Sequence, residues 1–218
     1  MKKLLSLALV LALLALVFGC KSAPEEPKGS LEVEGMAYPP KVLEHKNSAL
    51  GGDPPDWAFL DMEELEALDK YADFYVFKFD QIGENLEGVK AWTRSFVAAT
   101  EVSRIVSTRV MSKFAGAQVG DRDMVETYME EVAKVLSVAQ YSGARRAGDF
   151  WVLQQTFTDK GEPDKRIYRY WLLYTVPREQ IEDAIERALN EEDQKNKPKT
   201  EEEKVARDRV KELFDEGL

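Results

Sequence analysis

The chain is poor in the residues that build metal centres and covalent crosslinks. Its 218 residues include a single cysteine, Cys20, and a single histidine, His45. One cysteine cannot form an internal disulfide, so a folded domain has to be stabilised by its hydrophobic core. Zinc sites of the common types need several cysteine or histidine ligands, which these two residues do not supply. We interpret His45, alone in a proline-rich segment, as a solvent-exposed side chain.

Sequence motifs of the common enzyme classes are missing as well. The chain contains no Gly-x-Ser-x-Gly, no Walker loop, no His-Glu-x-x-His and no Cys-x-x-Cys. Carboxylate pairs such as Glu130 with Glu131 are abundant, and a solvated helix face explains them. Asp159, Glu162 and Asp164 resemble a loose calcium loop but lack the order of an EF-hand. We therefore predict that the protein is not an enzyme and that it holds no metal and no cofactor.

Positive charge is scarce relative to negative charge. There are 30 lysines and arginines against 40 aspartates and glutamates, for a formal net charge of −10. Residues 1–20 hold two lysines and no acid, so the remainder carries 28 basic and 40 acidic groups, or −12. Nucleic acid phosphates repel such a protein, and nucleic acid is not an expected partner. Arg145 and Arg146 beside Gly143 could bind an anion, although an exposed loop is the simpler interpretation.

A long apolar run is present only at the N-terminus. Met1-Lys2-Lys3 precedes Leu4–Phe18, and Gly19-Cys20 follows it. A charged start, an apolar stretch and a small residue before the cut are typical of a secretory signal peptide. At about fifteen residues the run is shorter than the roughly 20 that a spanning helix needs, which disfavours an uncleaved anchor. A cysteine directly after the small residue is the mark of a bacterial lipoprotein signal, although Phe18 is bulkier than usual there.

We therefore predict that residues 1–19 are a signal peptide and that the Cys20 thiol carries lipid. One acyl chain holds a protein weakly, at roughly 0.8 kcal/mol per buried methylene, whereas the three chains typical of lipoproteins hold it effectively permanently. Residues 20–56 contain six prolines and no sustained periodicity, which predicts a flexible tether. Lys21 is not the Asp that signals inner-membrane retention in enterobacteria. We expect the outer membrane, on either its periplasmic or its surface face.

From Trp57 onwards the pattern predicts a folded domain that mixes helices and strands. The expected elements are a short helix near residues 61–68, a strand over 71–79, a loop over 80–88, helices over 89–115 and 122–138, a hairpin with strands 150–158 and 166–176, a helix from Pro177, and a last helix opened by Thr200 and Glu203. The apolar stripe of the long helix is expected to include Val89, Trp92 and Val106. Asp121 or Gly120 could cap the next helix.

The predicted fold class is α+β. Three or four mostly antiparallel strands pack on one face against two or three helices, within a globular domain of residues 57–190. Residues 191–218 are expected to form an acidic tail with a short amphipathic helix, whose stripe includes Val205 and Val210. That helix docks on the domain, docks on a partner, or frays.

The aromatic residues of the hairpin are the remaining candidates for a binding surface. Trp151, Tyr168, Tyr170 and Trp171 could line a ligand pocket between the sheet and the helices, or they could face a partner. Packing of the hairpin into the core accounts for the same residues with fewer assumptions.

Together these features resemble the LPP-twenty family of bacterial lipoproteins. The resemblance lies in Pro55-Asp56-Trp57, in Ala98–Arg104 of the long helix and in the hairpin segment Tyr170–Val176, and it covers about residues 55–189. The chain departs from the usual Ala-Arg pairing by placing Ser103 before Arg104, and it adds the acidic tail. The resemblance implies an outer-membrane lipoprotein, sometimes linked to flagellar or envelope structures, with no established catalytic residues.

Two functional hypotheses follow from the sequence. The first is a non-catalytic, membrane-anchored envelope protein that acts by protein–protein interaction or in a structural role, with a partner not yet identified. The second is a lipoprotein that binds a small ligand in an aromatic-lined pocket between sheet and helices.

Overall fold

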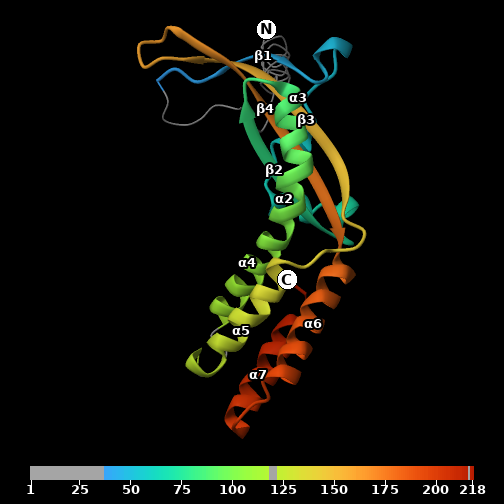
Figure 1. The fold of residues 1–218 in the computed structure, drawn as a ribbon. Coiled ribbons are helices and arrows are strands. Elements are labelled where there is room, and N and C mark those ends of the chain that lie inside the picture. Colours follow the sequence, from blue (N-terminus) through green and yellow to red (C-terminus); the bar gives the residue numbers. More distant parts are fainter. Residues whose placement is uncertain (1–36, 118–121, 216) are drawn as a thin grey trace, which may run out of the picture. The chain divides into compact units, whose positions relative to one another are not determined.

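The computed structural model describes residues 37–117, 122–215 and 217–218 (Figure 1). The expected signal peptide, Cys20 and the first part of the expected tether lie outside these residues, as do the two capping candidates Gly120 and Asp121. The elements are β1 (Lys41–His45), η1 (Ser48–Leu50), η2 (Asp56–Ala58), α2 (Met62–Glu66), η3 (Asp69–Tyr71), β2 (Phe74–Gly83), α3 (Leu86–Trp92), η4 (Thr93–Val97), α4 (Ala98–Ala117), α5 (Arg122–Ser137), β3 (Arg145–Phe157), β4 (Pro163–Pro177), α6 (Arg178–Lys195) and α7 (Glu201–Phe214).

One antiparallel sheet of four strands runs through the described part, in the order β1-β3-β4-β2. The β3–β4 hairpin is therefore central, and β1 and β2 are the two edge strands. In the hairpin, Trp151 lies opposite Tyr170, and a register shift between Arg146 and Gly148 marks a β-bulge. The α+β fold class and the antiparallel hairpin are confirmed.

The main hydrophobic core lies between one face of the sheet and the helices. Tyr75, Phe77 and Phe79 of β2 point into it, because side chains alternate between the two faces of a strand. Figure 1 shows α4 beside α5 and α6 beside α7, and α5 also contacts α6. Their buried side chains continue the same cluster; among them are Val106, Val110, Val125, Met129, Val132, Leu136, Ile181, Ile185, Leu189, Val210 and Phe214.

The opposite face of the sheet is covered too, which differs from the one-sided packing that the sequence predicts. Leu65 of α2 is buried against Val76 of β2 and Leu173 of β4, with Trp57 and Leu60 packed around them. Asp61 caps α2 through a capping box with Glu64, in which each side chain accepts a hydrogen bond from the other residue's backbone. The capped helix α2 and the short turns η2 and η3 therefore close this second, smaller core.

The long helix contains a π-helical turn, η4, that the sequence pattern does not reveal. The Thr93 hydroxyl donates to the carbonyl oxygen of Val89 at 2.7 Å, which competes with the backbone ladder at this point. Val89, Thr93, Ala98 and Val102 are buried, whereas Trp92, the last residue of α3 before the π turn, is 56% exposed. Its predicted place on the buried stripe is therefore wrong.

Part of the expected tether is a strand. Lys41–His45 pairs with Val152–Gln155 of β3, and the N–H of Lys46 donates to the carbonyl of Trp151 at 3.1 Å. The prediction of a flexible tether is therefore wrong for these residues, and the folded part begins before Trp57. The reason is that β1 is stabilised by backbone bonds to a neighbouring strand, while its side chains stay largely exposed and leave no apolar period.

Two further boundaries differ from the sequence prediction. The expected loop over residues 80–88 continues β2 to Gly83, because β4 offers pairing partners up to Tyr168, and α3 then begins after its cap Asn85. The expected acidic tail belongs to the folded part, since α6 extends to Lys195 and Val210 of α7 is buried in the main core. The α7 helix thus docks on the domain, with Thr200 as its cap, while Val205 is exposed.

Candidate functional site

The structure does not gather the four hairpin aromatics into one surface. Trp151, Tyr168 and Tyr170 share the face that meets the main core, whereas Trp171 lies on the other face, opposite Phe150. Tyr170 is 0% exposed and Trp171 4%. The rings pack on protein neighbours: Trp151 meets Tyr168 edge-on with centroids 5.8 Å apart, and Trp171 stacks on Phe150 at 6.0 Å. A binding surface that includes Tyr170 and Trp171 is therefore wrong, because strand periodicity separates neighbours and burial removes both from solvent.

The other candidate residues from the sequence also make contacts within the protein. His45 is half-buried rather than solvent-exposed, with its ring 5.7 Å from Phe150, because it belongs to β1. Arg145 lies over the ring of Phe74 at 5.0 Å. In the turn before β4, the Thr158 hydroxyl accepts the N–H of Glu162 at 3.2 Å. Across the part of the chain that the structure describes, no three His, Cys, Asp or Glu side chains are grouped to hold a metal ion.

A polar network that the sequence did not suggest joins four elements at the sheet. The Asp149 carboxylate of β3 accepts hydrogen bonds from the ammonium of Lys46 at 3.0 Å and from the guanidinium of Arg94 at 3.2 Å. The Arg94 Nε donates to the Tyr170 hydroxyl at 3.1 Å. No local sequence signal could have found this cluster, because its members are far apart in the chain and meet only in the folded sheet.

The electrostatics of this network favour an ionised Asp149. Burial alone would raise the pKa of its carboxyl group, but the hydrogen bond and charge of Lys46, with the charges of Arg94 and Arg146, outweigh it and lower that pKa. Burial raises the pKa of Tyr170, so its hydroxyl stays protonated. The network therefore links the end of β1 and the π turn to the β3–β4 hairpin through charged hydrogen bonds.

We expect an Asp149→Asn variant to be less sensitive to acid than the wild type. A carboxyl group whose pKa is lower in the folded state stabilises the fold above its unfolded pKa of about 4, and this contribution disappears as pH falls through the folded pKa. Urea unfolding at about pH 6 and pH 3 measures the loss of stability between the two values. A Lys46→Met variant lacks one of the cations that lower the Asp149 pKa, so it should also lose less stability than the wild type between about pH 6 and pH 3. Equal losses in the wild type and in Asp149→Asn would contradict this account.

A small pocket lies beside the network, where the long helix crosses the sheet. Its volume is about 260 Å³, and it is lined by Arg94, Ala98, Val102, Ser103, Ala139, Gln140, Tyr141, Ala144 and Tyr174. The Ser103 hydroxyl donates to the carbonyl of Ala139 and so serves to join α4 to the segment after α5. None of the four predicted aromatics lines this pocket.

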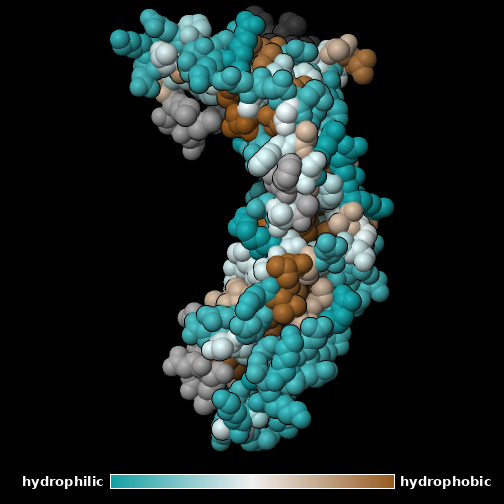
Figure 2. All heavy atoms as spheres, in the orientation of Figure 1, coloured by the Kyte–Doolittle hydropathy of each residue, from teal (hydrophilic) through white to brown (hydrophobic). Residues whose placement is uncertain are grey.

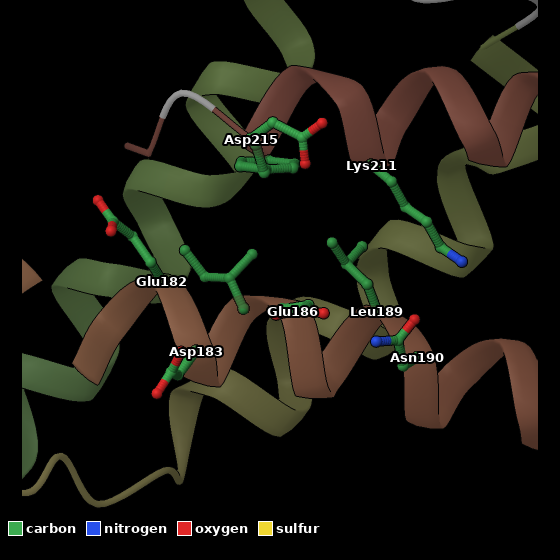
Figure 3. Close-up of a pocket in the computed structure, with 9 residues that line it drawn as sticks. Glu182, Asp183, Glu186, Leu189, Asn190, Lys211 and Asp215 are labelled. Atoms are coloured by element: carbon green, nitrogen blue, oxygen red, sulfur yellow. The ribbon is translucent and has the colours of Figure 1, made fainter. Parts of the chain in front are cut away.

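A second pocket, of about 290 Å³, lies between α6 and α7. Figure 3 shows Glu182, Asp183 and Glu186 on the α6 side and Asp215 on the α7 side, with the Lys211 ammonium toward Asn190. Ile185, Leu189 and Phe214 complete the lining, and all three are buried in the main core. Lys211 is already ion-paired with Asp193. The pocket thus has acidic side chains around its opening and buried apolar side chains at its base.

Where the polar turn joins α6 to α7, a third pocket of about 640 Å³ borders a nearly buried arginine. Arg207 donates to Asp193 at 3.2 Å and to Glu203 at 2.5 Å, and its guanidinium lies 4.5 Å from the centroid of the Tyr128 ring. Two carboxylates therefore compensate this charge inside the protein. These contacts help to hold α7 against α6.

The fourth pocket is an open groove along the outer side of β2. It has a volume of about 700 Å³ and is lined by Lys78, Phe79, Asp80, Gln81, Trp92, Thr100, Glu101, Arg104 and Ile105. One wall is therefore the edge strand β2, and the other is formed by the end of α3 and by α4. Of these four pockets, this is the one that borders a sheet edge, and it is our candidate interaction site.

The rest of the visible surface is mainly polar. Figure 2 shows hydrophilic side chains over most of this face, with apolar areas that are small and separate. Among the described residues, no helix combines the length and the hydrophobicity needed to cross a bilayer. None of the four pockets contains the histidine of the chain.

Comparisons with known proteins add nothing to this geometry. No protein-family model matches the chain, and neither a curated protein nor a solved structure is significantly similar to it. The resemblance to the LPP-twenty family therefore stays a prediction that depends on the short motifs quoted above.

Proposed function

We propose that this protein is a bacterial envelope lipoprotein, held on the outer membrane by acylated Cys20, that acts without catalysis through protein–protein contacts or in a structural role. The observation that carries the proposal is the order of the first twenty residues: two lysines, an apolar run, Gly19 and then Cys20. Membership of the LPP-twenty family is part of the same proposal.

The distance between the lipid and the folded part is compatible with this arrangement. Residues 21–36 separate Cys20 from the first described residue. Sixteen residues span at most about 50–60 Å when fully extended, which is enough to hold the domain clear of lipid headgroups. The acidic composition offers no general attraction to anionic lipids, so the acyl chains have to supply the attachment.

Two features of the described part favour interaction over small-ligand binding. The pocket between the long helix and the sheet, about 260 Å³, is below the roughly 300–1,000 Å³ of typical ligand sites. Tyr170 and Trp171, which the ligand hypothesis needs in a cavity wall, are buried among other side chains. The groove along β2, by contrast, is open and borders backbone groups that a protein partner can pair with.

We expect the wild-type chain to incorporate radiolabelled palmitate in a bacterial host and a Cys20→Ser variant to incorporate none. Serine lacks the thiol that forms the thioether to the lipid, so the acyl chains have nowhere to attach. Immunoprecipitation followed by autoradiography measures the label.

Ser22→Ala, two residues further on, is the matched control and should label like the wild type. Equal labelling of the wild type and Cys20→Ser would contradict the proposed anchor. Protease added to intact cells then distinguishes the surface face of the outer membrane, where the chain is cut, from the periplasmic face, where it is protected.

A further inference from the structure

Residues 38–50, near the start of the described part, carry a group of exposed apolar side chains. Four of the eight exposed large apolar residues that the structure describes lie within this segment: Tyr38, Val42, Leu43 and Leu50. The other four lie singly on β2, on α3, after α5 and on α7. Figure 1 shows β1 and the blue turn after it at one end of the described part, with α5 and α7 toward the other end.

Leu50 is the most exposed of these residues, and a hydrogen-bonded turn holds it outward. Its side chain is 92% exposed at the end of η1, and Figure 2 shows the apolar surface of this turn at the upper right. The Leu50 N–H donates to the Asn47 carbonyl at 3.0 Å, and the Asn47 side chain donates to the carbonyl of Asp53 at 2.8 Å. Gly51 then closes the turn at φ +64°, a left-handed conformation that favours glycine. The exposure of Leu50 is therefore a property of the folded turn.

The turn carries no charge that would hold it in water. Residues 47–52 read Asn-Ser-Ala-Leu-Gly-Gly, without an acid or a base, in a chain of which 32% is charged. The base that precedes them, Lys46, is held at the sheet, because its ammonium donates to the Asp149 carboxylate at 3.0 Å. Such a turn can enter the headgroup boundary of a bilayer without burying an ionised group.

The length of chain before this segment selects a lipid surface as its partner. The inference rests on the proposed function, in which Cys20 is acylated, and residues 21–36 separate that lipid from the described part. A flexible tether of sixteen residues has an average end-to-end distance of about 20–25 Å. The tether that clears the headgroups when it is extended therefore also lets the turn reach them. Tethering raises the effective concentration of the bilayer, so a contact too weak to bind a free chain is populated in an anchored one.

We propose that the turn of residues 47–52 inserts Leu50 into the headgroup–acyl boundary of the membrane that holds the lipid, as a second point of attachment beside Cys20. This contact orients the domain rather than anchoring it, because the acyl chains already bind effectively permanently. The exposed charges of Lys41 and Glu44 keep β1 at the level of the headgroups and limit insertion to the turn. The β1 end then faces the bilayer, and the connection between α6 and α7 faces away from it (Figure 1).

Hydrogen exchange on a chain with a chemically supplied tether tests this contact. Residues 20–218, made without the expected signal peptide, are coupled through the Cys20 thiol to a maleimide lipid in phosphatidylcholine vesicles. The coupling does not need acylation in cells. We expect the amides of residues 48–52 to exchange about tenfold more slowly in the coupled chain than in the uncoupled chain mixed with vesicles that lack the maleimide, since a turn inserted about nine-tenths of the time exchanges only in the remainder.

Two matched variants identify the side chain responsible. Leu50→Ser should remove the slower exchange, whereas Val138→Ser should leave it intact, because Val138 is 80% exposed after α5 and away from the turn. Both side chains are exposed, so neither substitution opens a cavity in the core. Equal exchange of residues 48–52 in the coupled and uncoupled chains, or slower exchange that persists in Leu50→Ser, would overturn the proposal.

A depth measurement separates insertion from proximity to the surface. In the acylated chain, Ala49→Cys supplies the one free thiol for a nitrobenzoxadiazole label, because the other cysteine carries lipid. Nitroxide lipids should quench this label but not the same label on Val138→Cys. Quenching at neither position, or equally at both, contradicts insertion. Slower exchange of residues 48–52 when the free chain is concentrated without vesicles would assign the turn to a second copy and exclude the lipid contact.

The two proposals fail separately. Slower exchange in the coupled chain, without palmitate on Cys20 in cells, contradicts only the proposed anchor. Palmitate on Cys20 with unchanged exchange of residues 48–52 contradicts only the contact of the turn with lipid.

Discussion

A Phe77→Ala variant is expected to lose about 3–5 kcal/mol of stability, the cost of truncating a buried phenylalanine. Phe77 lies near the middle of β2, is 0% exposed and belongs to the main core between sheet and helices. Its removal leaves a cavity under the helices and takes away the ring over which the Arg109 guanidinium lies at 5.6 Å. Since a domain of this size is stable by about 5–15 kcal/mol in total, a large part of the variant population should unfold on mild heating.

Urea unfolding followed by far-UV circular dichroism measures this effect. Leu50→Ala is the control for removing a large apolar side chain without creating a cavity, because Leu50 is 92% exposed. Its cost should stay within about 0.5 kcal/mol. Similar unfolding midpoints for the two variants would mean that the sheet and the helices do not share the core described here.

An Arg207→Ala variant is expected to lose about 3 kcal/mol, the lower end of the range for removing one partner of a buried ion pair. Arg207 is 6% exposed and donates to the carboxylates of Asp193 and Glu203. Without it Glu203 loses its ion-pair partner, and Asp193 keeps only Lys211. The helix that the sequence left free to dock or fray is therefore held in place by a charge as well as by its apolar residues.

Arg209→Ala is the matched control, because it removes the same side chain from an exposed position two residues further along α7. It should cost less than about 0.5 kcal/mol. The triple variant Asp193→Asn, Glu203→Gln and Arg207→Met should recover part of the loss, since it removes the two carboxylates that Arg207 compensates along with the arginine. Equal destabilisation by Arg207→Ala and Arg209→Ala would show that the buried pairs contribute nothing.

Periodicity within one element was enough to predict the main features of the fold. The hairpin, α4, α5 and α6 follow from apolar spacing and from turn residues such as Gly161, which adopts φ +80°. The sequence signal failed where a neighbour distant in the chain decides the outcome. β1 exists because β3 offers it backbone partners, and β2 continues to Gly83 because β4 pairs with it there.

The candidate site shows the same division. Its helix wall follows from the sequence pattern, but Asp80 and Gln81 of its strand wall fall where a loop was expected, and nothing local indicates that Asp80 and Arg104 line one groove. Of the aromatic residues that attracted attention in the sequence, Tyr170 and Trp171 are buried, and alternation along β4 sends them to opposite faces of the sheet.

The order of residues alone determined most of the helices and the hairpin, the α+β class and the prediction of a lipid on Cys20, because each depends on neighbours within a few positions. Only the tertiary structure decided which strands form the edges, which helix turns its tryptophan outward and which charges are buried in pairs. Those properties depend on contacts between segments that are distant in the chain, and no pattern within a single segment encodes them.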